Sequence, residues 1–356
     1  MGSLVLAQPM FARLSARYPG ATLHVLVFRR NREVLDLLDV VPRDHVLTID
    51  DRSAWSLLTG CLRVVARMRA LAPDVVIDCE LFARVSSILS FCSGAPLHVG
   101  FHPHTQEGLY RGSFISRPVL YNPYRHLTHQ LLSMVDAIAS SGMPTVKQEP
   151  EAPVAPPPMV TLSADERQRM SVRLLTDHPG SAGKTLVLIY PSGGLLPIRA
   201  WPIAHYIELC RALLADGYAV GVIGLAQDRP VAAAIRAACP DAACIDLTGY
   251  TASVRELLTL FHLAGLLITN DGGPGQFAAL TPVPSIVFFG PETPGLYGSW
   301  APNATNLFLG LSCSPCLTAF NHRNSPCDGD NQCLIRITPA RVLSLAKQAL
   351  VTRPVS

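Results

Sequence analysis

Hydrophobic and polar positions alternate along the first part of the chain with two different periods. Apolar residues recur at helical spacing and predict helices at residues 4–18, 31–38 and 54–70. Short apolar runs predict strands at residues 22–28, 45–49 and 74–77. This alternation of strand and helix favours a mostly parallel sheet. Such a unit normally begins with a strand, whereas this chain opens directly on the loop at Gly2, so we expect either a true start upstream of Met1 or a sheet without its first strand.

The pattern breaks at residues 143–161, where six of the nineteen positions are proline. Proline lacks the backbone N–H that a helix needs, and proline-rich segments favour extended chain. We interpret this stretch as a linker between an N-terminal domain, 1–142, and a C-terminal domain, 162–356. Directly after it, Ser163 and Glu166 have the S-x-x-E spacing of a capping box, which predicts a helix to about residue 175.

The second part of the chain repeats the strand and helix rhythm more regularly. Strands are predicted at 185–190, 218–223, 243–246, 265–269 and 285–289. Helices are predicted at 202–216, 230–238, 253–264, 275–280 and 338–350. The chain is therefore predicted to be α/β, with two doubly wound domains. Ligands of such domains bind outside the carboxyl ends of the strands, which directs attention to the loops that follow them.

Composition and charge narrow the classes of partner. Hydrophobic residues make up 49% of the 356 residues and charged residues only 15%, which favours extensive buried sheet. The net charge is +3 and no dense basic cluster with interleaved aromatic residues occurs, so we expect no nucleic-acid partner. No run approaches the roughly 18 to 20 apolar residues of a spanning helix, and no signal-peptide pattern opens the chain. We expect a cytoplasmic protein, with peripheral contact to the inner membrane left open by its apolar composition.

The stretch T-N-D-G-G-P-G-Q-F-A-A-L, at 269–280, follows a predicted strand and opens a helix. A helix start offers unpaired N–H donors to an anion, and glycines let a phosphate approach the backbone. Asp271, Gly272, Gly273 and Gln276 are therefore candidate ligand-binding residues. Two alternatives stay open: a glycine-rich turn without ligand, and a dinucleotide fingerprint of the form G-x-G-x-x-A.

A second loop, Y-P-S-G-G-L-L-P-I-R-A-W-P at 190–202, also follows a predicted strand. Ser192 and Gly193 belong to a turn of phosphate size, and Arg199 supplies a permanent positive charge. A solvated Arg199 is the alternative. Two such loops in one domain can converge on a single diphosphate.

Three stretches together resemble the ADP-heptose:lipopolysaccharide heptosyltransferase family over nearly the whole chain. They are G-S-L-V-L-A-Q-P-M-F-A-R-L near the start, P-S-G-G with R-A-W-P in the middle, and N-D-G-G-P-G-Q-F-A-A-L late in the chain. The resemblance implies a GT-B fold of two Rossmann-like domains facing a cleft, with an N-terminal acceptor domain and a C-terminal nucleotide-sugar donor domain. It implies inverting transfer without a metal cofactor, from a nucleotide-diphosphate sugar to a lipopolysaccharide core or similar glycan. It also implies that Arg199 contacts the donor and that Asp271, Gly272 and Gly273 line its site.

Two positions depart from the family pattern. Gln276 stands where the family commonly has His, and Gln can form hydrogen bonds but carries no charge. Ser3 stands where the family commonly has the Asp that serves as general base, and a serine is a poor base. Three explanations stay open: Glu107 takes the role, the leaving diphosphate makes a base partly dispensable, or the protein is inactive. A sugar-nucleotide epimerase of similar fold is the alternative activity.

The segment 100–112 places polar residues after a strand of the N-terminal domain. We expect His102, His104 and Arg111 to bind the sugar-bearing acceptor, together with Glu107. The two histidines lack a third ligand in the sequence, so we do not interpret them as a metal pair.

Four cysteines, Cys313, Cys316, Cys327 and Cys333, crowd into the segment 313–333. Their C-x2-C-x10-C-x5-C spacing suits tetrahedral zinc, and a structural zinc ion is the cofactor that this loop suggests. Unligated thiols that pack as small apolar groups are the alternative.

Overall fold

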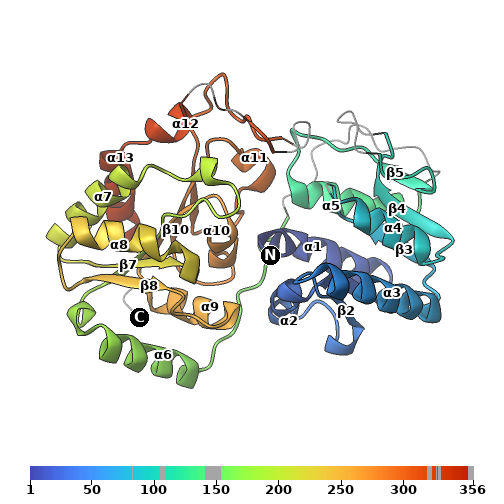
Figure 1. The fold of residues 1–356 in the computed structure, drawn as a ribbon, viewed down its shortest axis with the longest axis horizontal. Coiled ribbons are helices and arrows are strands. Elements are labelled where there is room, and N and C mark those ends of the chain that lie inside the picture. The colour runs from blue at the N-terminus through green and yellow to red at the C-terminus, as the bar shows by residue number, and fades with distance from the viewer. Residues whose placement is uncertain are drawn as a thin grey trace. The chain divides into compact units, whose positions relative to one another are not determined.

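The computed structural model describes residues 1–81, 83–104, 110–140, 154–318, 323–325, 327 and 330–351 (Figure 1). Its internal contacts divide the chain into two compact units. The first unit comprises Met1, Ser3–Ala155 and Leu317–Ser325, and the second comprises Gly2, Pro156–Cys316 and Pro326–Ser356. The main division, between Ala155 and Pro156, falls inside the proline-rich stretch 143–161.

The first unit alternates helices and short parallel strands. Its helices are α1 (Gly2–Arg17), α2 (Arg32–Leu38), α3 (Ala54–Leu71), α4 (Arg84–Cys92) and α5 (Leu127–Ala137). Its strands are β1 (Val25–Phe28), β2 (Val46–Ile49), β3 (Val75–Asp78), β4 (Leu97–Phe101) and β5 (Arg117–Val119). They form a two-stranded sheet, β1-β2, and a separate three-stranded sheet, β3-β4-β5. Within the described part of the chain, no strand joins the two sheets by hydrogen bonds.

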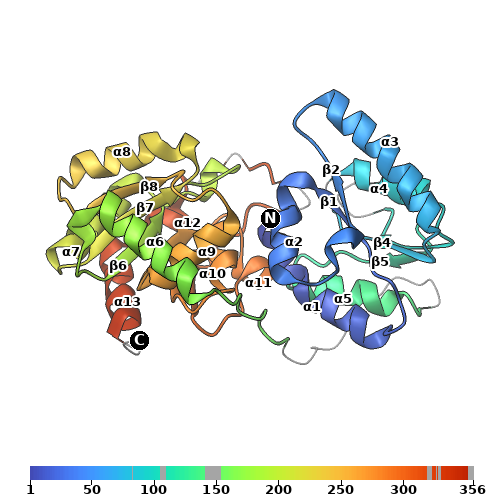
Figure 2. The ribbon, with the colours of Figure 1, turned by 90° about the horizontal axis from the view of Figure 1, so that it is seen from below.

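Helices cover both faces of these strands, as Figure 2 shows, with α3 and α4 on one face and α1 and α5 on the other. On the α1 and α5 side, Met10 and Met134 pack with Phe101 of β4. On the α3 and α4 side, Val64 and Leu89 pack with Ile49 of β2. The first unit therefore has cores on both sides of its strands.

The second unit is built on one parallel sheet of six strands in the order β11-β10-β9-β6-β7-β8. These strands are β6 (Leu186–Tyr190), β7 (Ala219–Gly224), β8 (Cys244–Thr248), β9 (Leu266–Asn270), β10 (Ser285–Phe288) and β11 (Ala304–Leu307). The helices are α6 (Ala164–Asp177), α7 (Ile203–Ala215), α8 (Arg229–Ala238), α9 (Val254–Leu263), α10 (Gly273–Ala278), α11 (Pro294–Tyr297), α12 (Gln332–Ile335) and α13 (Pro339–Val351). Our expectation that the sheet ends with 285–289 is wrong, because β11 pairs with β10 at the edge. The run Ala-Thr-Asn-Leu is too short and polar to signal a strand by itself, and pairing decides it.

The central strands of the second unit are almost fully buried. Val187, Ile189 and Ile268 have no exposed surface, because helices cover both faces of the sheet. The ring of Trp201 packs edge-on against that of Tyr206, with 4.9 Å between centroids. The Tyr206 hydroxyl donates to the carbonyl of Tyr190, so this aromatic pair lies at the carboxyl end of β6.

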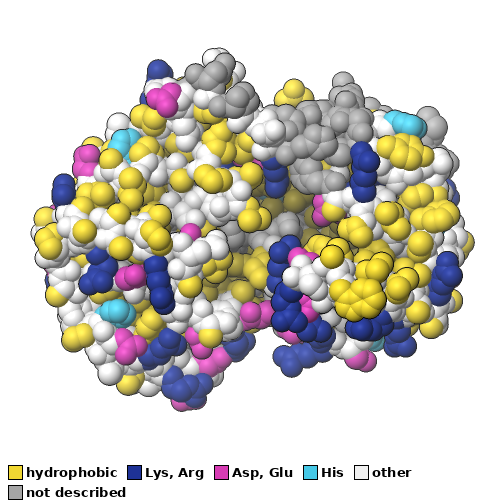
Figure 3. Space-filling view, viewed as in Figure 1, with side chains coloured by type: hydrophobic (Ala, Val, Ile, Leu, Met, Phe, Trp, Pro, Cys, Tyr) yellow, Lys and Arg dark blue, Asp and Glu magenta, His cyan; other side chains and the backbone are white. Residues whose placement is uncertain are grey.

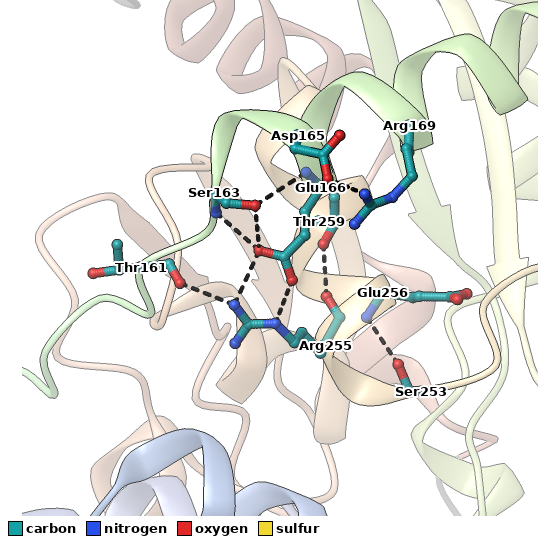
Figure 4. Close-up of polar contacts among 9 residues, drawn as sticks. All are labelled: Thr161, Ser163, Asp165, Glu166, Arg169, Ser253, Arg255, Glu256 and Thr259. Carbon is teal, nitrogen blue, oxygen red and sulfur yellow. Dashed lines mark hydrogen bonds and ion pairs between the residues drawn. The ribbon is translucent and has the colours of Figure 1, made fainter.

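The capping box at the start of α6 is present as predicted, and Figure 4 shows its contacts. The Ser163 hydroxyl accepts from the Glu166 N–H at 3.1 Å, and the Glu166 carboxylate accepts from the Ser163 N–H at 2.8 Å. Arg255 of α9 donates to the same carboxylate. The hydrogen bonds from Arg255 are the largest cause that lowers the pKa of Glu166 to about 2. One carboxylate thus caps α6 and ties it to α9.

Candidate functional site

The two glycine-containing loops of the second unit lie side by side. One follows β6 and the other follows β9, and these strands are parallel neighbours in which Tyr190 pairs with Thr269. Parallel neighbours end at the same edge of a sheet, so their following loops meet there. The structure therefore brings together residues that are about eighty positions apart, as the convergence of the loops requires.

Asn270 joins these loops through all of its side-chain hydrogen-bonding capacity. Its Nδ2 donates to the Ser192 carbonyl at 3.1 Å and points to the Tyr190 carbonyl at 3.4 Å. Its Oδ1 accepts from the Trp201 N–H at 2.9 Å and the Tyr206 hydroxyl at 3.1 Å. The sequence interpretation missed Asn270. Its signal was a polar residue that ends an otherwise apolar strand, since such a residue must find partners when buried.

Arg199 and Asp271 form an ion pair at the mouth of these loops. The distance from Arg199 Nη1 to Asp271 Oδ2 is 3.3 Å, and both side chains are largely buried. Arg199 Nη2 also lies 3.5 Å from the Gly193 carbonyl. Arg199 Nε is buried and has no hydrogen-bond partner within the described residues. A guanidinium with an unused donor, held in place by a carboxylate, can bind a further anion.

The turn that carries Ser192 depends on glycine. A Cβ at Gly193 would lie 2.7 Å from the Leu196 carbonyl oxygen, which no side chain tolerates. Gly194 has φ of +60°, a left-handed conformation that favours glycine. The backbone of this turn therefore requires glycine at both positions.

Gln276 lies buried in α10, which begins at Gly273, two residues before the predicted start. Its Nε2 donates to the Tyr297 carbonyl at 2.6 Å. Its Oε1 is also buried, and no described residue hydrogen-bonds to it. An acceptor oxygen left without a donor in a buried position favours a ligand hydroxyl or amide as its partner. Gly272 precedes this helix in a fully extended conformation.

The residues predicted for the acceptor do not share one surface. His104 is exposed, and its N–H donates to His102 Nδ1 at 3.1 Å. Arg111 is only 2% exposed and forms an ion pair with Asp78. Glu107 lies outside the described residues. The acceptor assignments of His102, His104 and Arg111 stay predictions, and the burial of Arg111 gives it a role inside the first unit.

Asp78 is a buried carboxyl at the carboxyl end of β3 that the sequence interpretation missed. Besides Arg111, it accepts hydrogen bonds from the hydroxyls of Ser86 at 3.2 Å and Ser87 at 3.3 Å. Burial raises the pKa of Asp78, and the neighbouring Arg111 charge opposes this effect. The signal was an aspartate directly after the apolar run Val-Val-Ile, where a strand ends.

Ser3 is exposed in the first turn of α1, and that turn contains no acidic residue. The position therefore carries no carboxylate that could act as a base. The three explanations for the missing base therefore stay open: Glu107 takes the role, the leaving diphosphate makes a base partly dispensable, or the protein is inactive.

The described cysteines of the segment 313–333 lie near one another, and they form no metal-binding arrangement with the other described residues. Burial raises the pKa of Cys333 to about 11, and the neighbouring Cys316, Cys327 and Cys313 contribute to the increase. The Cys327 sulfur accepts from the Asn331 N–H at 3.1 Å. In the described ranges, no three His, Cys, Asp or Glu side chains gather so that they could hold a metal ion. Zinc at these four cysteines stays a prediction, and no step of the reaction is derived from it.

Solved structures show which known proteins share this fold. The structure of E. coli ADP-heptose lipopolysaccharide heptosyltransferase II matches with a TM-score of 0.73 and 21% identity, over 98% of this chain and 96% of that chain. The structure of E. coli heptosyltransferase WaaC with ADP matches with a TM-score of 0.65 and 18% identity, over 98% and 97%. The fold is thus the GT-B fold with parallel sheets, which confirms the predicted fold class.

The chain belongs to glycosyltransferase family 9 (heptosyltransferase), whose family model matches residues 61–325. The lipopolysaccharide heptosyltransferase 2 of Salmonella typhimurium is 25% identical over 360 residues, covering 96% of this chain and 94% of that protein. The resemblance seen in the sequence is confirmed, and the protein is a glycosyltransferase. Membership in a transferase family decides against the epimerase alternative. Among the described residues, no helix is both long and apolar enough to cross a membrane.

Proposed function

We propose that the protein transfers a heptose in the cytoplasm from ADP-heptose to a lipopolysaccharide core or similar glycan, with inversion and without a metal cofactor. The pair of Arg199 and Asp271 at the junction of the two loops carries this proposal. The names of the related proteins support the choice of donor and acceptor, since they include ADP-heptose and lipopolysaccharide.

In the proposed complex, the donor diphosphate lies against Arg199 and the turn at Ser192 and Gly193. An acceptor hydroxyl attacks the anomeric carbon, and the bond from that carbon to the diphosphate oxygen breaks. The electron pair passes to the diphosphate, where the Arg199 charge stabilises it. Asp271 orients the guanidinium, and the buried Gln276 Oε1 accepts a hydrogen bond from the donor. The hydroxyl proton passes to Glu107 or to the leaving diphosphate.

The substitution Arg199→Ala tests the proposal. We expect the transfer rate to fall about 10²-fold or more, as with the loss of one preorganised charge-stabilising donor, and Arg199→Lys to recover part of it. ADP release from ADP-heptose in the presence of a lipopolysaccharide-core acceptor measures the rate. Arg167→Ala, an exposed arginine of α6, is the matched control. An unchanged rate in Arg199→Ala would show that the assignment is wrong.

The same assay tests which group accepts the proton and whether the transfer needs a metal ion. Glu107→Gln lowers the rate if that residue is the base, and leaves it unchanged if the diphosphate takes the proton. A chelator leaves the rate unchanged if the transfer needs no metal ion. A protein that binds donor but releases no ADP under any of these conditions is inactive.

A further inference from the structure

Helices α3 and α4 of the first unit expose large apolar side chains to solvent. On α3, Trp55, Leu58 and Leu62 are 73%, 53% and 66% exposed. On α4, Ile88 and Phe91 are 61% and 63% exposed. Their spacing of three and four positions places the side chains of each helix along one face. Single exposed apolar residues are common, whereas contiguous sets mark interaction sites. We call these five residues the α3–α4 surface.

The two helices form one continuous surface because they pack on each other. Val64 and Met68 of α3 contact Leu89 of α4 in the core beneath them. Arg69 of α3 donates to the Cys92 carbonyl at the end of α4 at 2.9 Å. Figure 3 shows hydrophobic side chains gathered over the area where Figure 1 draws α3 and α4.

All charged side chains on these two helices are positive. Arg63, Arg67 and Arg69 are exposed on α3, Arg84 is exposed at the start of α4, and neither helix contains Asp or Glu. Just before α3, Asp50 pairs with Arg52, so it does not offset the arginines of the helix. Exposed apolar residues flanked by arginines are typical of segments that lie in the interface of an anionic membrane.

We propose that the α3–α4 surface docks this protein on a bilayer that contains anionic phospholipid. Trp55, with Leu62 and Phe91, enters the boundary between head groups and acyl chains, where an indole is favoured. The arginines bind lipid phosphates while their stems cover apolar surface. A second copy of this chain fits less well, because a two-fold contact would bring the arginines of one copy against those of the other. The proposal goes beyond the transfer reaction and needs no donor to be tested.

Flotation with vesicles tests the docking. We expect the wild-type protein to float with phosphatidylcholine vesicles that contain phosphatidylglycerol, and much less with phosphatidylcholine alone. The triple variant W55S/L62S/F91S should bind at least about tenfold more weakly, because three large apolar groups no longer leave water. V172S/L175S on α6 also removes exposed apolar residues and is the matched control. Circular dichroism checks that each variant is folded.

A second pair of variants tests the charge. R63Q/R67Q should lose most of the preference for phosphatidylglycerol, and added salt should weaken the wild-type binding. Equal flotation of the wild type and both sets of variants would overturn the proposal. So would a wild-type dimer, seen by sedimentation, that the triple variant converts to monomer without any change in flotation. Because no donor is present, a failure here is distinct from a failure of the transfer assay.

Discussion

A single amide at residue 270 connects loops that lie 78 positions apart. Asn270 can connect them because its side-chain amide has N–H donors and an acceptor oxygen, and it uses both in hydrogen bonds. Aspartate at the same position would keep the acceptor but lose the donors to the carbonyls of Ser192 and Tyr190. The geometry of the proposed donor site therefore depends on a residue that we do not expect to touch the donor.

Arg111 allows a sharper test at the same scale. In Arg111→Met the buried Asp78 carboxyl loses its charged partner, so we expect the free energy of unfolding to fall by about 3–5 kcal/mol. Urea denaturation measures this loss. Ser86→Ala, which removes one hydroxyl from the same carboxyl, should cost about 1 kcal/mol.

If Arg111 instead binds the acceptor, as the sequence predicts, the same substitution should change acceptor binding and not stability. If Arg111 binds the acceptor, Arg111→Met raises the KM for the acceptor and leaves the free energy of unfolding near the wild-type value. Measuring both quantities on one preparation separates the two roles.

At the scale of elements, the contact between α6 and α9 depends on the charge of Glu166. Its pKa is lowered to about 2 by Arg255 and Ser163, so the folded state binds this proton less readily than the unfolded state. The stabilisation is therefore complete above the unfolded pKa, about 4.5, and is lost as the pH falls toward 2.

Glu166→Gln should lower the free energy of unfolding by about 1 kcal/mol at neutral pH, because the pair is partly exposed and screened by solvent. The difference from the wild type should shrink as the pH falls from about 4.5 to about 2. Urea denaturation at several pH values measures this, with Glu208→Gln on the exposed face of α7 as control. A difference that stays constant with pH would contradict the role of the ionised carboxylate.

For the cysteine-rich segment 313–333, two roles stay open: binding a structural zinc ion, or packing as unligated thiols. If the four thiols hold zinc, the purified protein contains about one equivalent, and a chelator lowers its free energy of unfolding. Elemental analysis decides this, since less than about one-tenth of an equivalent would leave packing as the role of the cysteines. Cys61→Ser, a half-buried cysteine of α3, is the control for the loss of a thiol.

For the whole molecule, each unit has its own hydrophobic core, and that of the second unit is more completely buried. Its strands β6 and β9 are buried throughout or nearly so, whereas every residue of β1 is half-buried. We therefore expect the first unit to unfold at the lower urea concentration.

Donor should act on the second unit, which holds the proposed site. At about 100 times its dissociation constant, ADP-heptose should stabilise that unit by about 2.7 kcal/mol. Fluorescence of Trp201, buried in the second unit, follows the effect, and the Arg199→Ala variant should reduce it. If donor instead shifts only the transition of the first unit, the donor site has been placed in the wrong half of the chain.

The sequence by itself determined most helices and strands, because the period of apolar positions is a property of consecutive residues. It also placed the loops 190–202 and 269–280 after strands, supplied their chemistry, and showed that position 3 carries a serine and no carboxylate. Strand order came only from the tertiary structure, since pairing depends on residues far apart in the chain, and so β11 and the separation of β1-β2 from β3-β4-β5 were not foreseen.

The same reason explains the polar residues that sequence reasoning missed or placed differently. Asn270, Asp78 and Arg111 owe their roles to partners brought close by folding, which no local pattern encodes. The exposed apolar residues of α3 and α4 also became visible only when the structure showed which face of each helix the core covers. Local periodicity determines what an element is, and only packing decides what each of its side chains contacts.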